Sequence, residues 1–256
     1  HAVPVPEGTT VESLTEAVCG FNVAGPEARR LLQGLTSADL SNGAFPFFRS
    51  KRLTVAGIEV VALRVSFTGD LGWELHCAEG EQVALYRALL EAGQAVGAGP
   101  VGSRALMSLR LEKGYGSWGR DYSPEYWPQE SGLAGLVKAD KDFLNKDSWL
   151  QVEAEPPREE MCLLEIDATV ADASGSEPIF LPDGTPVGQV SSGGYGYAVG
   201  KSLALCYLRA GAVAPGDAVE VAILGQPHAA RRLTEAPFDP KGLKLRDVHP
   251  EPEPAE

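Results

Sequence analysis

The chain contains few of the residues that stabilise small proteins through covalent or metal cross-links. Among its 256 residues are only four cysteines and four histidines. The cysteines are scattered without a C-x-x-C pair, and the histidines lack the spacing of metal ligands. This pattern argues against a disulfide framework and against a metal site. It favours reduced thiols in a cytosolic or matrix compartment.

Basic residues are also scarce. The chain has 22 Lys and Arg residues against 35 Asp and Glu residues, which gives a net charge of −13. Nucleic acids and anionic membranes need a basic surface, so neither is an expected partner. No apolar run is long enough to span a membrane, and no signal peptide is visible. The first methionine is Met107, which leads us to expect a fragment or a processed product.

The length and composition are those of a globular protein with two domains. Hydrophobic residues make up 44% of the chain and charged residues 22%. The composition changes at the run E-A-E-P-P-R, residues 153–158. We therefore expect one domain at 1–152, a second at 153–248 and an acidic tail at 249–256.

The first predicted domain mixes helical and strand patterns, which indicates an α+β fold. The predicted helices are 26–35, 81–95 and 104–113. The predicted strands are 18–23, two within 52–65, and 73–77. The continuous apolar run at 60–63 indicates a strand that is buried on both faces.

The second predicted domain consists of short strands separated by turns, without long helices. Its predicted strands are 161–166, 178–181, 187–191, 202–207 and 218–224. This regular series predicts a small β-barrel or sandwich. The Gly-rich segment 191–197 matches neither a P-loop nor G-x-G-x-x-G, so nucleotide binding is not expected there.

Two ionic residues stand out because apolar residues flank them. On a strand, Glu74 shares a face with His76, while Trp73 and Leu75 point the other way. Such a carboxylate can accept two hydrogen bonds from an N–H pair of a heterocycle. The alternative is an ordinary surface carboxylate on an amphipathic edge strand, and the pattern alone favours it.

Arg110 lies between two leucines on a predicted helix. Its guanidinium could hold a carboxylate or a ring oxygen bidentately. In the alternative, the Arg110 stem covers apolar surface and its head reaches solvent. Aromatic residues including Phe67 lie near these ions, and two of them, Tyr115 and Trp118, flank glycines. These two could stack on a flat ring, although ordinary core packing is the commoner use of such residues. No nucleophile–base–acid triad can be assembled from the sequence.

Several segments carry motifs in a fixed order, beginning with F-T-G-D-L-G-W-E-L at residues 67–75 and S-L-R-L-E-K-G-Y at residues 108–115. They resemble the Y-x-G-E-x-G-[WYF]-E-[LI] and S-L-R-L-E-[AK]-G segments of the glycine-cleavage T-protein (aminomethyltransferase) family. The runs W-G-R-D at 118–121 and E-S-G-L at 130–133 follow. The segments 191–194, 200–204 and 237–240 resemble the family's C-terminal barrel. The run 111–121 resembles most the branch of dimethylglycine and sarcosine dehydrogenases.

The resemblance implies a truncated folate-binding domain followed by a small β-barrel. It also implies that Glu74 binds the edge of the pterin ring of tetrahydrofolate and that Arg110 lies in the same pocket. Phe67 and Trp118 would line that pocket, with Phe67 in place of the more usual Tyr. The aspartate implicated in catalysis would belong to an absent N-terminal part, so no catalytic residue is expected in this chain.

The resemblance favours the folate-binding part of a demethylating oxidoreductase that transfers a one-carbon unit from an N-methyl amine to tetrahydrofolate. FAD would bind only to a missing N-terminal domain of the full-length parent, and this fragment alone would be inactive. A free-standing aminomethyltransferase of the glycine cleavage system is the first alternative. A non-catalytic, folate-binding regulatory homologue is the second.

Overall fold

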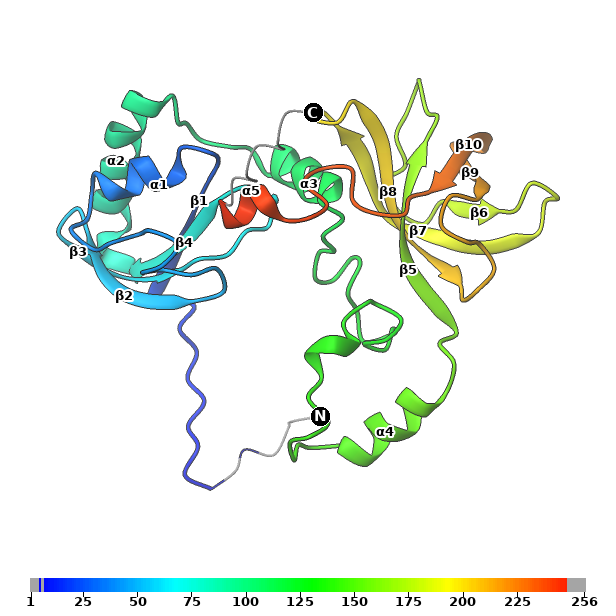
Figure 1. Cartoon of the computed structure of the whole chain (residues 1–256), viewed down its shortest axis with the longest axis horizontal. Coiled ribbons are helices and arrows are strands. Elements are labelled where there is room, and N and C mark those ends of the chain that lie inside the picture. Colours follow the sequence, from blue (N-terminus) through cyan, green and yellow to red (C-terminus); the bar gives the residue numbers. More distant parts are fainter. Residues whose placement is uncertain (1–4, 6, 248–256) are drawn as a thin grey trace, which may run out of the picture. The chain divides into compact units, whose positions relative to one another are not determined.

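A computed structural model describes Val5 and residues 7–247, which form two compact units. The first unit contains the described residues up to Val101 together with those from Gly242 onwards, and the second is Gly102–Lys241 (Figure 1). The expected domain boundary between residues 152 and 153 lies inside a helix of the second unit and stays a prediction. The predicted acidic tail, 249–256, lies outside the described residues.

The first unit is built on a four-stranded antiparallel sheet with the order β1-β4-β3-β2. The strands are β1 (Val18–Ala24), β2 (Ser50–Val55), β3 (Ile58–Leu63) and β4 (Gly72–Ala78). Helices α1 (Ala28–Gln33) and α2 (Gln82–Gly93) contribute their apolar sides to the same core. Two 3-10 turns, η1 (Glu79–Glu81) and η2 (Gln94–Val96), flank α2.

The run at 60–63 does not form a strand buried on both faces, so that prediction is wrong. Burial alternates along β3: Val60 and Ala62 are buried, while Val61 and Leu63 are only half-buried. The helices pack on one face of the sheet (Figure 1), so alternate side chains enter the core. A continuous apolar run therefore does not require two covered faces.

The chain returns to the first unit through α5 (Leu243–Arg246), a contact that the sequence did not predict. The buried guanidinium of Arg64 donates to the carbonyl oxygen of Arg246 over 2.9 Å and to that of Phe45 over 2.7 Å. The same guanidinium lies 5.5 Å from the ring of Trp73, which is fully buried in the sheet's core. The segment after the barrel thus completes the first unit.

The second unit contains a closed barrel of six strands in the order β10-β5-β8-β7-β6-β9. These strands are β5 (Glu159–Ile166), β6 (Pro178–Phe180), β7 (Pro186–Gly196), β8 (Lys201–Arg209), β9 (Ala218–Ile223) and β10 (Gln226–Arg232). Of the two folds predicted, the barrel is therefore confirmed. Helix α3 (Ser103–Glu112) precedes a long connection with η3 (Ala134–Leu136) and α4 (Lys146–Ala154). The sequence did not predict α4 or β10.

None of the described helices is long and apolar enough to cross a membrane.

Candidate functional site

Glu74 lies on an inner strand, because β4 pairs with β1 on one side and β3 on the other. The edge-strand alternative is therefore wrong. The predicted alternation along β4 is confirmed: Trp73 and Leu75 are buried, and the Glu74 and His76 side chains are 39% and 37% exposed. The Glu74 carboxylate lies 3.4 Å from Nε2 of His76. An inner strand holds this partly exposed carboxylate in a fixed position.

Phe67 opens the turn that leads into β4. The hydroxyl of Ser66 accepts a hydrogen bond of 2.9 Å from the backbone N–H of Gly69, which has a φ of +88°. That positive φ favours glycine, so the G-D-L-G sequence folds locally into this turn. Phe67 is half-buried and Glu74 starts the exposed face of the following strand. One continuous segment of the first unit thus carries both predicted residues.

Arg110 belongs to the second unit, and its guanidinium is buried rather than solvated. The side chain is 1% exposed, and Nη1 lies 2.6 Å from the fully buried carboxylate of Asp121. Nη1 also donates to the carbonyl of Tyr115 over 3.1 Å, whereas Nε has no partner among the described residues. Burial lowers the pKa of Arg110, and the neighbouring Asp121 opposes that shift. The solvated-head alternative is therefore wrong.

Asp121 accepts four hydrogen bonds through its two carboxylate oxygens. Oδ2 accepts from Arg110 and from the backbone N–H of Ser117 over 2.8 Å. Oδ1 accepts from the hydroxyls of Ser191 and Ser192 over 2.5 and 2.6 Å. These serines are consecutive, and a bulge in β7 at this point lets both reach the same oxygen. Asp121 thereby fastens the 117–122 turn to the barrel.

The same turn exposes Trp118, whose surface is 79% accessible. Gly119 donates its N–H to the carbonyl of Tyr122 over 2.8 Å, which closes the turn. A Cβ at Gly116 would lie within 3 Å of the Tyr122 ring, so only glycine allows this packing. The turn therefore presents an indole to solvent from a fixed backbone.

A second buried acid holds the next part of the connection. Glu130 is 1% exposed and binds Arg158 through both oxygens, with N–O distances of 2.8 and 2.7 Å. The Arg158 hydrogen bonds, with backbone N–H groups of Trp127 and Arg158, lower the Glu130 pKa to about 2. The adjacent Ser131 hydroxyl lies 2.9 Å from that of Tyr207, which donates to the carbonyl of Asp121. Burial raises the pKa of Tyr207 to about 12.

The structure thus divides the four predicted site residues between its compact units. Phe67 and Glu74 belong to the first unit, and Arg110 and Trp118 to the second. Asp121 and Glu130 were part of the quoted motifs, but sequence reasoning gave them no role. The available signal was two acids, each two residues from a glycine, in a segment rich in aromatics. Their charged partners are Arg110 on α3 for Asp121, and Arg158, just before β5, for Glu130.

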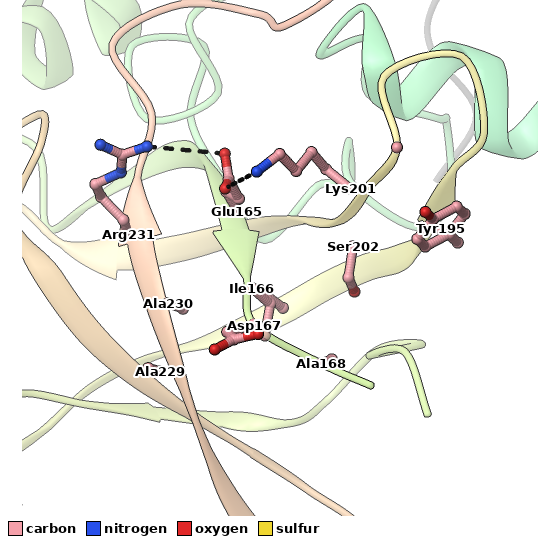
Figure 2. A pocket seen from close by; sticks show the side chains of 11 residues that line it. Glu165, Ile166, Asp167, Ala168, Tyr195, Lys201, Ser202, Ala229, Ala230 and Arg231 are labelled. Atoms are coloured by element: carbon pink, nitrogen blue, oxygen red, sulfur yellow. Dashed lines mark hydrogen bonds and ion pairs between the residues drawn. The ribbon is translucent and has the colours of Figure 1, made fainter. Parts of the chain in front are cut away.

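A separate cavity of about 580 Å³ lies at one end of the barrel, between β5, β8 and β10 (Figure 2). Its charged groups largely satisfy one another: Lys201 Nζ lies 2.8 Å from Glu165, and Arg231 lies 3.8 Å from the same carboxylate. The buried hydroxyl of Ser202 has no partner among the described residues. None of the predicted site residues lines this cavity. No group of three or more metal-ligating side chains occurs in the described part of the chain.

Comparison with known families assigns both parts of the chain. Residues 2–141 match the model of the GCVT N-terminal domain, and residues 160–239 match that of the glycine cleavage T-protein C-terminal barrel domain. The chain belongs to the glycine-cleavage T-protein family. The resemblance inferred from the motifs is therefore confirmed, as is an α+β part followed by a small barrel.

Similar proteins come from two groups of enzymes. The chain is 39% identical to human mitochondrial dimethylglycine dehydrogenase over 88% of its length and 34% identical to human mitochondrial sarcosine dehydrogenase over 90%. It spans only 26% of each of these relatives. The crystal structure of aminomethyltransferase T from Bartonella henselae matches 84% of this chain and 57% of that chain, with a TM-score of 0.72 and 25% identity.

Proposed function

We propose that this chain is the folate-binding part of a demethylating oxidoreductase of the dimethylglycine or sarcosine type. In this proposal tetrahydrofolate accepts a one-carbon unit that originates from an N-methyl amine. The family assignment and the 39% identity to dimethylglycine dehydrogenase support it. FAD would belong to the full-length parent. The names of the mitochondrial relatives support a mitochondrial location, which we take to be the matrix. In a bacterial parent the corresponding compartment would be the cytoplasm.

Glu74 carries the folate proposal. A pterin presents adjacent N–H groups along one ring edge, and a carboxylate can accept from both of them. The Glu74 side chain fits this role because it is 39% exposed on an inner strand. Its contact with Nε2 of His76 is long, at 3.4 Å, which leaves the carboxylate able to accept hydrogen bonds from a ligand. Phe67, which precedes the same strand, would offer an apolar face for stacking. Tetrahydrofolate supplies the nitrogen atoms that accept the one-carbon unit when it is bound.

The guanidinium of Arg110 is less available for direct contact with a ligand than the carboxylate of Glu74. Its Nη1 is already bonded to Asp121 and Tyr115, although Nε is left without a partner in the described structure. We assign it, within this proposal, to holding the 117–122 turn through Asp121. The ligand-facing group of that turn is then Trp118, the exposed aromatic.

The test is titration calorimetry of tetrahydrofolate into the full chain and into Glu74→Gln. Hydrogen bonds to a charged group contribute about 1.5–3 kcal/mol, so loss of the charge should weaken binding by about 10- to 100-fold. Glu91→Gln, which changes an exposed carboxylate on α2, is the matched control and should bind like wild type. Wild-type affinity in Glu74→Gln would exclude Glu74 as the pterin ligand.

A free-standing aminomethyltransferase is the second candidate, because the chain is 29% identical to that enzyme from Caldanaerobacter subterraneus over 86% of its length. In the full-length parent of the first candidate, Glu74→Gln should leave flavin reduction by the amine intact and slow methylenetetrahydrofolate formation. A parent protein that binds no flavin would favour the aminomethyltransferase. A folate-binding parent without turnover of either substrate class would favour the non-catalytic, regulatory homologue.

A further inference from the structure

The four cysteines form two pairs, each directly across two antiparallel strands. Cys19 of β1 lies opposite Cys77 of β4, and Cys162 of β5 lies opposite Cys206 of β8. All four are free thiols. The sequence spacing that excluded a C-x-x-C motif therefore did not exclude proximity, because strand pairing brings together residues that are far apart along the chain.

We propose that Cys19 and Cys77 are an oxidation site that closes to an intramolecular disulfide across β1 and β4. Their sulfur atoms lie 3.4 Å apart. Opposite residues in an antiparallel pair have Cα atoms about 4.5–5.5 Å apart, and disulfides span Cα separations of about 4.4–6.8 Å. The bond can therefore form by side-chain rotation, without a change in strand register.

The exposure of the two thiols decides which of them is oxidised first. Cys19 is half-exposed, whereas Cys77 is 3% exposed. Burial, and then the neighbouring Cys19 thiol, raise the pKa of Cys77 to about 11, so this thiol is a poor first nucleophile. Cys19 is the group that an oxidant reaches first, and Cys77 is placed to resolve the product.

With hydrogen peroxide as the oxidant, the Cys19 thiolate attacks one peroxide oxygen, the O–O bond breaks and the first water leaves. This step gives a sulfenic acid at Cys19. The Cys77 sulfur then attacks the Cys19 sulfur, forms the S–S bond and displaces the second water. Two thiols lose two electrons in total, peroxide is reduced to two waters, and the thiol protons end in those waters.

The barrel pair provides an internal comparison because its geometry is different. Cys162 is 6% exposed and Cys206 is fully buried in the barrel core. Each thiol is directed to a backbone carbonyl: Cys162 to that of Glu160 at 3.4 Å, and Cys206 to that of Cys162 at 3.5 Å. Burial raises the pKa of Cys162 to about 12. The same oxidant should leave this pair reduced.

The disulfide would cross-link β4, which carries the candidate folate residue Glu74, to its neighbour β1, in which Asn22 lies opposite Glu74. The oxidation proposal does not depend on folate binding. Oxidation of the Cys19–Cys77 pair should stiffen the β1–β4 ladder, which hydrogen exchange of β1 and β4 peptides measures directly.

The experiment treats the full chain with stoichiometric hydrogen peroxide and counts free thiols in denaturant. The expected result is a fall from four thiols to two, a monomer lighter by two hydrogens, and a Cys19–Cys77 cross-linked peptide after proteolysis. Cys19→Ser, a change at the half-exposed position, should lose the cross-link. Cys162→Ser, the matched control, should retain it.

Three outcomes would overturn the proposal. The first is a cross-link between Cys162 and Cys206 in place of the predicted one. The second is addition of oxygen atoms to Cys19 without a cross-link. The third is equal loss of two thiols in wild type and in Cys19→Ser. Because Cys19 is half-exposed, its serine variant should fold, and circular dichroism of the untreated variant checks this.

Discussion

Replacing Asp121 with asparagine measures how much the buried ion pair between Arg110 and Asp121, which holds the 117–122 turn, contributes to stability. The substitution keeps the shape of the side chain but leaves one acceptor oxygen instead of two. Oδ2 of Asp121 accepts from Arg110 and from the backbone N–H of Ser117, and Oδ1 accepts from the two serines of β7. Whichever way the new amide is turned, its NH₂ group therefore faces hydrogen-bond donors instead of acceptors. The positive charge of Arg110 remains buried without its partner.

The expected cost follows from that geometry. Both side chains of the pair are at most 1% exposed. Removing one partner of such a buried pair costs about 3–5 kcal/mol, because the remaining charge is uncompensated. For a unit of this size, the corresponding fall in Tm is about 10–15 °C. The surface ion pair between Lys201 and Glu165 gives a contrasting control, because the Lys201 side chain is 51% exposed. Lys201→Ala should lower the free energy of unfolding by less than about 1 kcal/mol.

Urea unfolding of wild type, Asp121→Asn, Arg110→Met and the double variant completes a mutant cycle. Hydrogen exchange of peptides from residues 102–241 reports the second unit separately, since the chain contains two units. The double variant removes both charges, so its loss should be smaller than the sum of the single losses by about 2 kcal/mol or more. Additive losses, or a cost below about 1 kcal/mol for Asp121→Asn, would refute the reasoning.

Two further predictions concern the second unit. The Glu130 pKa falls from an ordinary 4.5 to about 2, a stabilisation of about 3 kcal/mol that screening at the exposed Arg158 reduces to about 2 kcal/mol. Because the folded-state pKa is depressed, this stabilisation is present above pH 4.5 and is lost as the pH falls towards 2. The difference in unfolding free energy between wild type and Glu130→Gln should shrink over that window, and a constant difference would contradict this assignment. Gly188→Ala should destabilise the barrel by about 1–3 kcal/mol, since the added Cβ would collide with the Tyr207 carbonyl oxygen. Gly135→Ala, where no atom lies within 4 Å of the added Cβ, should be near neutral in the same thermal melt.

Short-range patterns predicted the parts of the fold that depend on them. Alternation of apolar residues placed Trp73 and Leu75 in the core and Glu74 on the other face, and β4 has that arrangement. Strand β10, Gln226–Arg232, was missed because its sequence Q-P-H-A-A-R-R has few apolar residues. Its pairing with β5 and β9, rather than its own pattern, makes it a strand.

The environment of Arg110 could not be predicted in the same way. A helical pattern relates a residue to neighbours three or four positions away, and the first of these with a charge is Lys113. The actual partner, Asp121, lies eleven residues away across a glycine-containing turn. The bulge that aligns Ser191 and Ser192 also has no clear sequence signature. The alternative of a solvated arginine was reasonable from local spacing and was wrong because of a tertiary contact.

Binding and folding roles are mixed within single motifs of this chain. In W-G-R-D, Trp118 is 79% exposed while Asp121 is fully buried, and in E-S-G-L the acid is buried and bonded to Arg158. A motif match selects all of these residues together, but only burial and hydrogen bonding separate those that can face a ligand. Loss of folate affinity on changing Asp121 would therefore not make it a ligand, since the 117–122 turn that presents Trp118 would also be released. The discriminating comparison is Trp118→Ala. If this substitution weakens folate binding without lowering the free energy of unfolding, then the Trp118 indole contacts the ligand. Asp121 then affects folate binding only indirectly, by holding the 117–122 turn in place.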